Sequence, residues 1–207
     1  MVDGLYQSKE EVLACGQENA RVGGLKYADL DGNGIINADD QTWILNPVPD
    51  FSYGINVGLD YKGFDLTVFL QGVQGVQVYN GQKFQTDFWS LTDAGSNKGS
   101  RLLGAWTTAN TSSLIPALTT NNTGDEGRAS TYFVENGSYL KVRDLSLGYN
   151  LPTDVLQKCK LSKLRFYLSG HNLLTLKSKS LTCKDPENPN WAYPLATSVT
   201  FGVQVGF

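Results

Sequence analysis

The chain has 207 residues and a formal net charge of -3, so it lacks the basic surface that nucleic-acid binding requires. Glycine (22 residues) and aromatic residues (11%) are abundant, and this composition favours strands and long polar loops over helices. No run of about 18 apolar residues occurs, which excludes a membrane-spanning helix but leaves membrane-spanning strands open.

The N-terminal segment does not resemble a secretory signal, because Met1–Gly4 has neither a basic region nor an apolar stretch. The sequence therefore predicts either a cytoplasmic protein or a chain whose true N-terminus lies upstream. The cysteines, Cys15, Cys159 and Cys183, have no CxxC spacing. They predict neither a metal knuckle nor a disulfide scaffold, and we expect them to be inert.

Residues 29–40 have the spacing of a calcium-binding loop. Gly34 at loop position 6 permits a sharp turn, and Ile36 at position 8 can anchor the loop. The expected ligands of a structural Ca2+ ion are the side chains of Asp29, Asp31, Asn33, Asn37 and Asp40 and the backbone carbonyl of Ile35. Asp40 replaces the usual glutamate, as in dockerin-type loops, and a shorter acid binds more weakly. The alternative is an Asp/Asn/Gly turn held by its own side-chain hydrogen bonds.

Alternating apolar and polar residues predict antiparallel strands in the rest of the chain. These segments are residues 51–61, 64–71, 139–151, 163–176 and 199–207. In the last segment every second residue from Val199 to Phe207 is apolar, and the residues between them are small or polar. Most of these segments run for roughly 9–13 residues, which is longer than a typical soluble strand and suits a tilted membrane crossing.

The connections between these strands are asymmetric. Lys62-Gly63 is a tight turn and residues 152–162 form a compact link, whereas residues 73–138 and 177–196 are long and polar. Short turns on one side and long loops on the other are typical of outer-membrane barrels, whose long loops lie outside the cell. The predicted fold class is therefore all-β, an antiparallel transmembrane β-barrel segment with long extracellular loops.

Five or six strands are too few to close a barrel, since the smallest membrane barrels have about 8. Open edges in lipid would leave backbone groups unpaired at a cost of several kcal/mol each. We therefore expect a piece of a larger barrel, or an oligomer that shares one barrel. Residues 1–50 are predicted to be a strand remnant and an extracellular loop with the calcium-type motif, and residues 51–207 to be the C-terminal barrel strands and loops.

Six stretches of the chain resemble, in family order, the SusC/RagA-type TonB-dependent outer-membrane receptors of Bacteroidetes. They are Gly24–Gly34, Asn46–Gly54, Tyr61–Leu66, Phe69–Gly75, Ser138–Tyr149 and Ser169–Thr175. The resemblance covers essentially the whole chain and maps it to the C-terminal fifth of a receptor whose barrel has about 22 strands. The terminal Phe207 resembles the signal that such barrels present to their assembly machinery.

This resemblance implies an outer-membrane importer of oligosaccharides or peptides, not an enzyme. It also implies a SusD-like lipoprotein that captures the ligand, contact with outer-membrane lipid, and TonB as the energy source, acting through an N-terminal part that this sequence lacks. No nucleic-acid partner is expected.

The alternative function is a soluble β-sandwich that binds carbohydrate through loop tryptophans. The candidate residues are Trp43, Trp89, Trp106 and Trp191, although packing between loops is the favoured interpretation of these tryptophans. Only scattered carboxylates in the sequence support an enzymatic function. His171 has no nucleophile motif beside it and is expected to be a polar residue at a strand end. Asp125-Glu126 is expected to be solvated loop charge.

Overall fold

The computed structural model describes residues 1–88, 97–120, 126–158, 160–190 and 193–207. The chain forms two compact units. The loop unit comprises Met1–Asn46, Val78–Glu135 and Pro189–Trp191. The sheet unit comprises Pro47–Gln77, Asn136–Asn188 and Ala192–Phe207.

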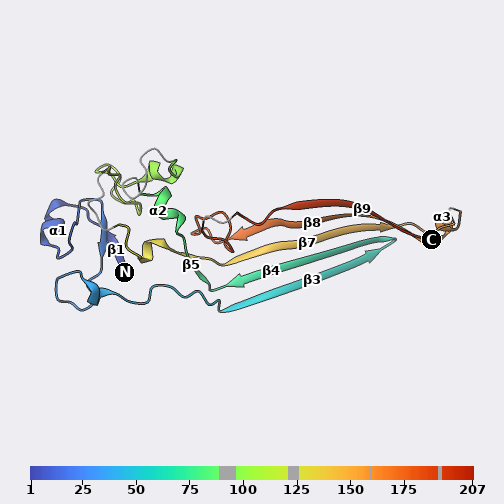
Figure 1. Ribbon diagram of the computed structural model, residues 1–207, viewed down its shortest axis with the longest axis horizontal. Helices are drawn as coiled ribbons and strands as arrows, with labels where there is room; N and C mark the ends of the chain where they lie inside the picture. The colour runs from blue at the N-terminus through green and yellow to red at the C-terminus, as the bar shows by residue number, and fades with distance from the viewer. Residues whose placement is uncertain (89–96, 121–125, 159, 191–192) are drawn as a thin grey trace. The chain divides into compact units, whose positions relative to one another are not determined.

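The sheet unit is built on five antiparallel strands in the order β3-β4-β7-β8-β9, which lie side by side in Figure 1. The strands are β3 (Phe51–Tyr61), β4 (Phe64–Gln74), β7 (Tyr139–Asn150), β8 (Lys163–Lys177) and β9 (Ser198–Gly206). All five strands predicted from the alternating pattern are confirmed, with ends that differ by up to three residues. Neighbours in this order are also consecutive in the chain, apart from the short strands β5 and β6, so the sheet is an up-and-down meander.

A two-residue turn joins β3 to β4, as the sequence predicts. Its central residues are Lys62 (φ 48°) and Gly63 (φ 87°), and Tyr61 pairs with Phe64 across it. Positive φ at both central positions is the conformation that matches the twist of a hairpin. The carbonyl of Gly63 also accepts a hydrogen bond from the backbone N–H of Asn150 at 2.7 Å, which extends the β4–β7 pairing beyond the strand end.

Two β-bulges interrupt the ladder near the middle of β7. Between β4 and β7 the register shifts so that Arg143 has no direct partner, and between β7 and β8 it shifts again at Asn172 and Leu173. One inserted residue exchanges the two faces of a strand. Val142 therefore pairs with Leu70, and the next residue along, Lys141, pairs with Gln71. Lys141 thus lies on the polar face of the sheet.

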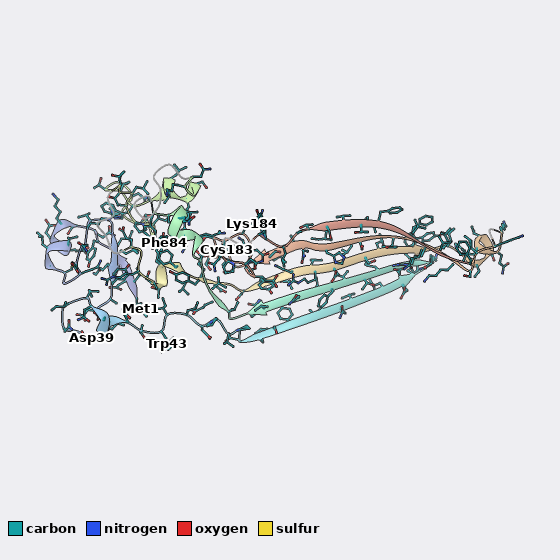
Figure 2. The ribbon with its side chains drawn as sticks, viewed as in Figure 1. Met1, Asp39, Trp43, Phe84, Cys183 and Lys184 are labelled. Carbon is teal, nitrogen blue, oxygen red and sulfur yellow. The ribbon has the colours of Figure 1, made fainter. Side chains whose placement is uncertain are left out.

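One face of the sheet is apolar and open. Ile55, Leu147 and Val203 are 47%, 43% and 46% exposed, and Val68 between them is half-buried. Other large apolar residues exposed on these strands include Phe51, Val57, Leu59, Tyr61, Phe64, Phe166, Leu168, Leu174, Leu176, Val199, Phe201 and Val205. Figure 2 shows side chains standing along the whole length of the strands. The apolar residues at every second position of these strands are therefore not packed in a protein core.

The opposite face carries polar contacts that cross three strands. Arg165 in β8 donates to both carboxylate oxygens of Asp65 in β4, at 2.9 and 2.5 Å, and Asn150 at the end of β7 donates to the same group at 2.9 Å. Gly148 makes room between them, since a Cβ there would lie 2.5 Å from atoms of both Arg165 and Asp65. A paired charge of this kind belongs on the face turned away from lipid.

The two ends of the sheet differ. The β3–β4 turn, the short helix α3 (Thr153–Lys158) and the C-terminus lie at one end, and the connections that follow β4 and β8 leave from the other (Figure 1). This is the asymmetry of short and long connections that the sequence predicts.

The loop unit consists of short elements around an aromatic core. These elements are β1 (Val2–Leu5), α1 (Lys9–Ala14), β2 (Leu25–Tyr27), the 3-10 helix η1 (Ala38–Asp40), α2 (Gln82–Thr86), η2 (Ser100–Gly104) and η3 (Thr131–Phe133). β1 pairs with β2, and the short strand β5 (Gln77–Tyr79) pairs with β6 (Val134–Asn136). The core residues are Leu5, Leu25, Tyr27, Phe88, Trp106 and Phe133.

The predicted fold class needs one correction. The chain is mostly β and not all-β, because short helices occur in both units. Within the described residues, β3 and β9 each pair with one neighbour only, so the five strands form an open antiparallel sheet and not a closed barrel, as expected of so few strands. In the same residues, no helix has the length and apolar character needed to cross a membrane.

Candidate metal centre

The loop with calcium-type spacing lies in the loop unit between β2 and η1. Its backbone bends at Gly32 (φ 75°) and Gly34 (φ 81°). Residues with a Cβ atom rarely adopt such positive φ values. The sharp turn predicted at loop position 6 is therefore present at Gly34. The loop is largely exposed, and Figure 2 labels Asp39 within its final turn.

Three carboxylates converge in this loop. One oxygen from each of Asp29, Asp31 and Asp40 lies within 4.8 Å of the others, although these residues are up to eleven positions apart in the sequence. Like charges at this spacing repel one another, and a bound cation would remove that repulsion. Oxygen ligands from aspartates are what a hard cation such as Ca2+ prefers, so the donor set fits the ion.

The amide side chains predicted as ligands take part in turns. Asn33 donates to Asp31 Oδ2 at 2.7 Å and accepts the backbone N–H of Ile35 at 2.7 Å. Asn37 accepts the backbone N–H of Asp39 at 2.6 Å and caps η1. These contacts are also those of a self-supporting Asp/Asn turn. The structure thus groups the three aspartates, while the roles of Asn33, Asn37 and the Ile35 carbonyl as ligands stay predictions.

Asp40 is the buried member of the group. Its two carboxylate oxygens accept the backbone N–H groups of Leu30 at 2.6 Å and of Asn37 at 2.8 Å. The hydrogen bond from Asn37, followed by that from Leu30, lowers the pKa of this carboxyl below its ordinary value. Asp40 is therefore ionised at neutral pH, as a metal ligand must be.

The loop is fixed to the rest of the loop unit through its eighth position. Ile36 packs against the aromatic core, and its backbone N–H donates to the Gly16 carbonyl at 3.1 Å. Gly16 allows this close approach, because a Cβ there would lie 1.8 Å from the carbonyl oxygen of Gly34. The anchoring role predicted for Ile36 is confirmed.

Other residues singled out in the sequence lie in different settings. Glu126 is 2% exposed and forms an ion pair with Arg21, so the expectation of a solvated loop charge is wrong for this residue. His171 lies within β8 and not at its end, and its Nδ1 contacts the carboxylate of Asp144. Arg21 lies far from Glu126 in the sequence, and no local pattern connects the two.

Two of the tryptophans can be placed. Trp106 is buried in the core and donates its indole N–H to Gln7 at 2.9 Å, whereas Trp43 is 97% exposed. Trp106 therefore packs within the protein, as the packing interpretation predicts. Cys15 and Cys183 are thiols, and the Cys183 thiol donates to the Asp185 carbonyl at 3.5 Å. Trp89, Trp191, Asp125 and Cys159 lie outside the described residues.

Sequence reasoning missed a charged cluster on the polar face of the sheet unit. Lys141 Nζ lies 2.8 Å from Asp185 Oδ1 and 2.5 Å from Glu187 Oε2, and Arg143 also contacts Glu187. Burial raises the pKa of Asp185, but the hydrogen bonds from Lys141 and from the backbone of Glu187 and Leu195, with the charge of Lys141, together lower it below its ordinary value. The only signal in the sequence is two basic residues, Lys141 and Arg143, within a strand pattern.

Comparison with known proteins places the chain among receptors. No family model matches. Over 99% of its length the chain is 31% identical to TonB-dependent receptor P26 of Formosa agariphila, of which it spans 22%. It is 38% identical to TonB-dependent receptor P3 of the same organism over 74% of the chain and 14% of that protein. It is 30% identical to TonB-dependent receptor SusC of Bacteroides thetaiotaomicron, over 87% of the chain and 17% of SusC.

Solved structures show the same relationship. A structure of the RagAB peptide transporter matches with a TM-score of 0.72 and 26% identity, over 89% of this chain and 21% of the solved chain. The RagAB peptide importer in its open-open state matches with a TM-score of 0.75 over 100% of this chain and 22% of the solved chain. At 24% identity, this second match speaks for the fold alone.

The open antiparallel sheet and these similarities define the class: the chain is a segment of a TonB-dependent receptor, a class of outer-membrane protein. Within that class it belongs to the SusC/RagA type of Bacteroidetes. The chain spans 14–22% of the length of the curated relatives described above.

Proposed function

We propose that this chain forms part of the barrel wall of an outer-membrane importer, a transporter and not an enzyme. The observation that carries the proposal is the sheet of five antiparallel strands with one exposed apolar face and one polar face. Lipid stabilises exposed apolar side chains, and a water-filled lumen suits the polar ones. In this arrangement the connections after β4 and β8 are extracellular, and α3 and the β3–β4 turn are periplasmic.

The proposed cargo is an oligosaccharide or a peptide, taken up with energy from TonB and with a SusD-like lipoprotein as partner. The similarity to the RagAB peptide transporter supports a peptide and a two-component assembly. The similarity to SusC supports the receptor class but does not choose between the two cargoes.

The test compares charges placed on the two faces of β7 in the complete receptor that carries this sequence. Leu147→Arg puts a cation on the apolar face, and Ser146→Arg puts the same cation on the polar face one residue away. Arginine facing lipid near the bilayer midplane costs about 2–4 kcal/mol, whereas a lumen-facing arginine is tolerated. We expect Leu147→Arg alone to reduce the amount of folded, heat-modifiable receptor in the outer membrane.

Equal loss of folded receptor from both variants would contradict a lipid-facing surface. The β-sandwich alternative predicts a different outcome, because a second protein layer would cover the apolar face. In that case the protein would be monodisperse in plain buffer and would show no heat-modifiable migration.

We further propose that the loop of residues 29–40 binds Ca2+ as a structural clip. The grouping of Asp29, Asp31 and Asp40, with the positive φ of Gly34 between them, supports the proposal. Loop sites of this kind bind Ca2+ with dissociation constants on the order of 10⁻⁴–10⁻³ M in extracellular proteins. Bound ion would order the loop and supply no chemistry.

Calcium titration with hydrogen exchange as the readout tests this clip. Millimolar CaCl2 is expected to increase the protection of backbone amides in residues 29–40, and a chelator is expected to reverse it. Asp31→Asn removes a charge with little change of shape and should abolish the response. Asp3→Asn, an exposed aspartate in the same unit, is the matched control and should leave it intact. If calcium did not change the hydrogen-exchange protection of the unmodified protein, a self-supporting Asp/Asn turn would explain the loop instead.

A further inference from the structure

A cavity of about 190 Å3 lies in the sheet unit between β8 and the connection that follows it. Residues from both segments line it, among them Lys141, Thr175, Lys184, Asp185 and Pro194. Lys141 and Thr175 are direct partners in the β7–β8 ladder, so the floor of the cavity is part of the polar face. In Figure 2, Lys184 lies next to Cys183 in the connection after β8.

The bulge in β8 builds one wall of the cavity. Asn172 adopts a positive φ of 51° there, and its side-chain amide donates to the Ala196 carbonyl at 3.2 Å. Its side-chain oxygen accepts a hydrogen bond from Arg143 at 3.0 Å, and its backbone carbonyl accepts the hydroxyl of Thr197 at 3.0 Å. The bulge therefore fastens the returning end of the connection, just before β9, to the sheet.

Ion pairs hold another part of the cavity lining in place. Lys141 is 1% exposed and holds both Asp185 and Glu187, and the hydroxyl of Tyr139 donates to Glu187 at 2.8 Å. The second oxygen of Asp185 accepts the backbone N–H of Leu195 at 3.2 Å. A buried charge with this many partners has little freedom to move, so the cavity is preformed and not created by a ligand.

Lys184 supplies a positive charge that is available to a ligand. Its side chain is exposed at the rim, and among the described residues no ion pair or hydrogen bond of its ammonium group is observed. The neighbouring carboxylate of Asp185 is already committed on both oxygens. Thr175 adds a hydroxyl group that can donate or accept, and Pro194 and Leu195 add an apolar surface.

We propose that this cavity is a subsite for a carboxylate-bearing end of the cargo, with Lys184 as the residue that pairs with the carboxylate. The inference rests on the proposed function, since cargo reaches the polar face only in an importer. The cavity is smaller than the roughly 300–1,000 Å3 of pockets for drug-sized ligands, so it fits one terminal residue. The carboxylate can come from the C-terminus of a peptide or from a uronic acid of an oligosaccharide.

The experiment measures carboxylate preference in the complete, detergent-solubilised receptor by isothermal titration. One arm compares triglycine with triglycine amide, and the other compares a galacturonate disaccharide with its methyl ester. The unmodified receptor should bind the acid of at least one pair more tightly than its neutral form. Lys184→Gln should reduce that preference by roughly three- to fivefold, the magnitude of a partly exposed ion pair.

Lys179→Gln is the matched control, because Lys179 is an exposed lysine in the same connection that does not line the cavity. It should leave the preference unchanged. Equal loss in both lysine variants, or no preference for either acid in the unmodified receptor, would overturn the subsite. These results are independent of the arginine substitutions on β7. A receptor that passes that test but shows no acid preference refutes the subsite and leaves the importer proposal standing.

Discussion

At the scale of single residues, the loop of residues 29–40 depends on carboxylates that bind their own backbone. Asp29 accepts the backbone N–H groups of Gly32 and Gly34, both at 2.7 Å, and Asp40 accepts those of Leu30 and Asn37. The two hydrogen bonds of Asp40 lower the pKa of its carboxyl, and this shift links the conformation of the loop to pH.

The lowered pKa of Asp40 gives this linkage a sign. The pKa in the folded protein lies below the value of about 3.9 expected for the unfolded chain, so the hydrogen bonds stabilise the loop above about pH 4. That stability is lost as the pH falls through the lower, folded pKa. Hydrogen-exchange protection of residues 29–40, corrected for intrinsic rates, should be constant between about pH 7 and 5 and should decrease below about pH 4.

Asp40→Asn is the control for this prediction. Asparagine keeps one acceptor oxygen but does not titrate, so the protection of the loop in this variant should be lower and independent of pH. A pH profile that is the same in the variant and the unmodified protein would assign the acid sensitivity to another group.

At the scale of elements, glycine positions on the polar face determine how the strands are tied together. The Arg165 side chain crosses β7 to reach Asp65 in β4, and it passes over Gly148. Similarly, the ring of Tyr167 covers Gly202 in β9. In both cases a large side chain occupies space that a neighbouring Cβ would fill.

Gly148→Ala is therefore expected to destabilise the sheet. The new methyl group would lie 2.5 Å from atoms of Arg165 and Asp65 and would separate the ion pair, at a cost of about 1–3 kcal/mol. Gly58→Ala in β3 is the matched control, because a Cβ at that glycine would meet no other atom within 4 Å and both glycines face the polar side. The temperature at which the folded receptor loses its heat-modifiable migration should fall for Gly148→Ala only.

At the scale of the whole molecule, the chain exposes two features that water does not favour. One is the apolar face of the sheet, and the other is the pair of outer edges of β3 and β9, which have no partner strand within the described residues. Exposed strand edges are sites of aggregation, and five strands are too few for closure. Further barrel strands would pair the two edges, and lipid would cover the apolar face.

The isolated chain should therefore require detergent. Expressed without further receptor sequence, it is expected to aggregate in plain buffer, to disperse in detergent, and to show no heat-modifiable band in electrophoresis. The complete receptor should show that band. A monodisperse, folded chain in detergent-free buffer, measured by light scattering and circular dichroism, would contradict the barrel and favour the sandwich.

Much of this organisation can be predicted from the sequence, because its signals are local. Alternation with a period of two determined the strands, and the Lys62-Gly63 pair determined the turn between β3 and β4. The spacing of aspartates and glycines in residues 29–40 likewise predicted a compact loop with converging carboxylates. Each of these features depends on residues that are close together in the chain.

Only the tertiary structure decided which charges meet. The bulge at Arg143 moves Lys141 onto the polar face, where it binds Asp185 from 44 residues away, and Glu126 is buried against Arg21. An inserted residue moves every later side chain of the strand to the opposite face of the sheet. In the sequence, this break in the alternation looks the same as the end of a strand. A buried ion pair is likewise stable only when both partners are in place, so neither residue reveals it alone.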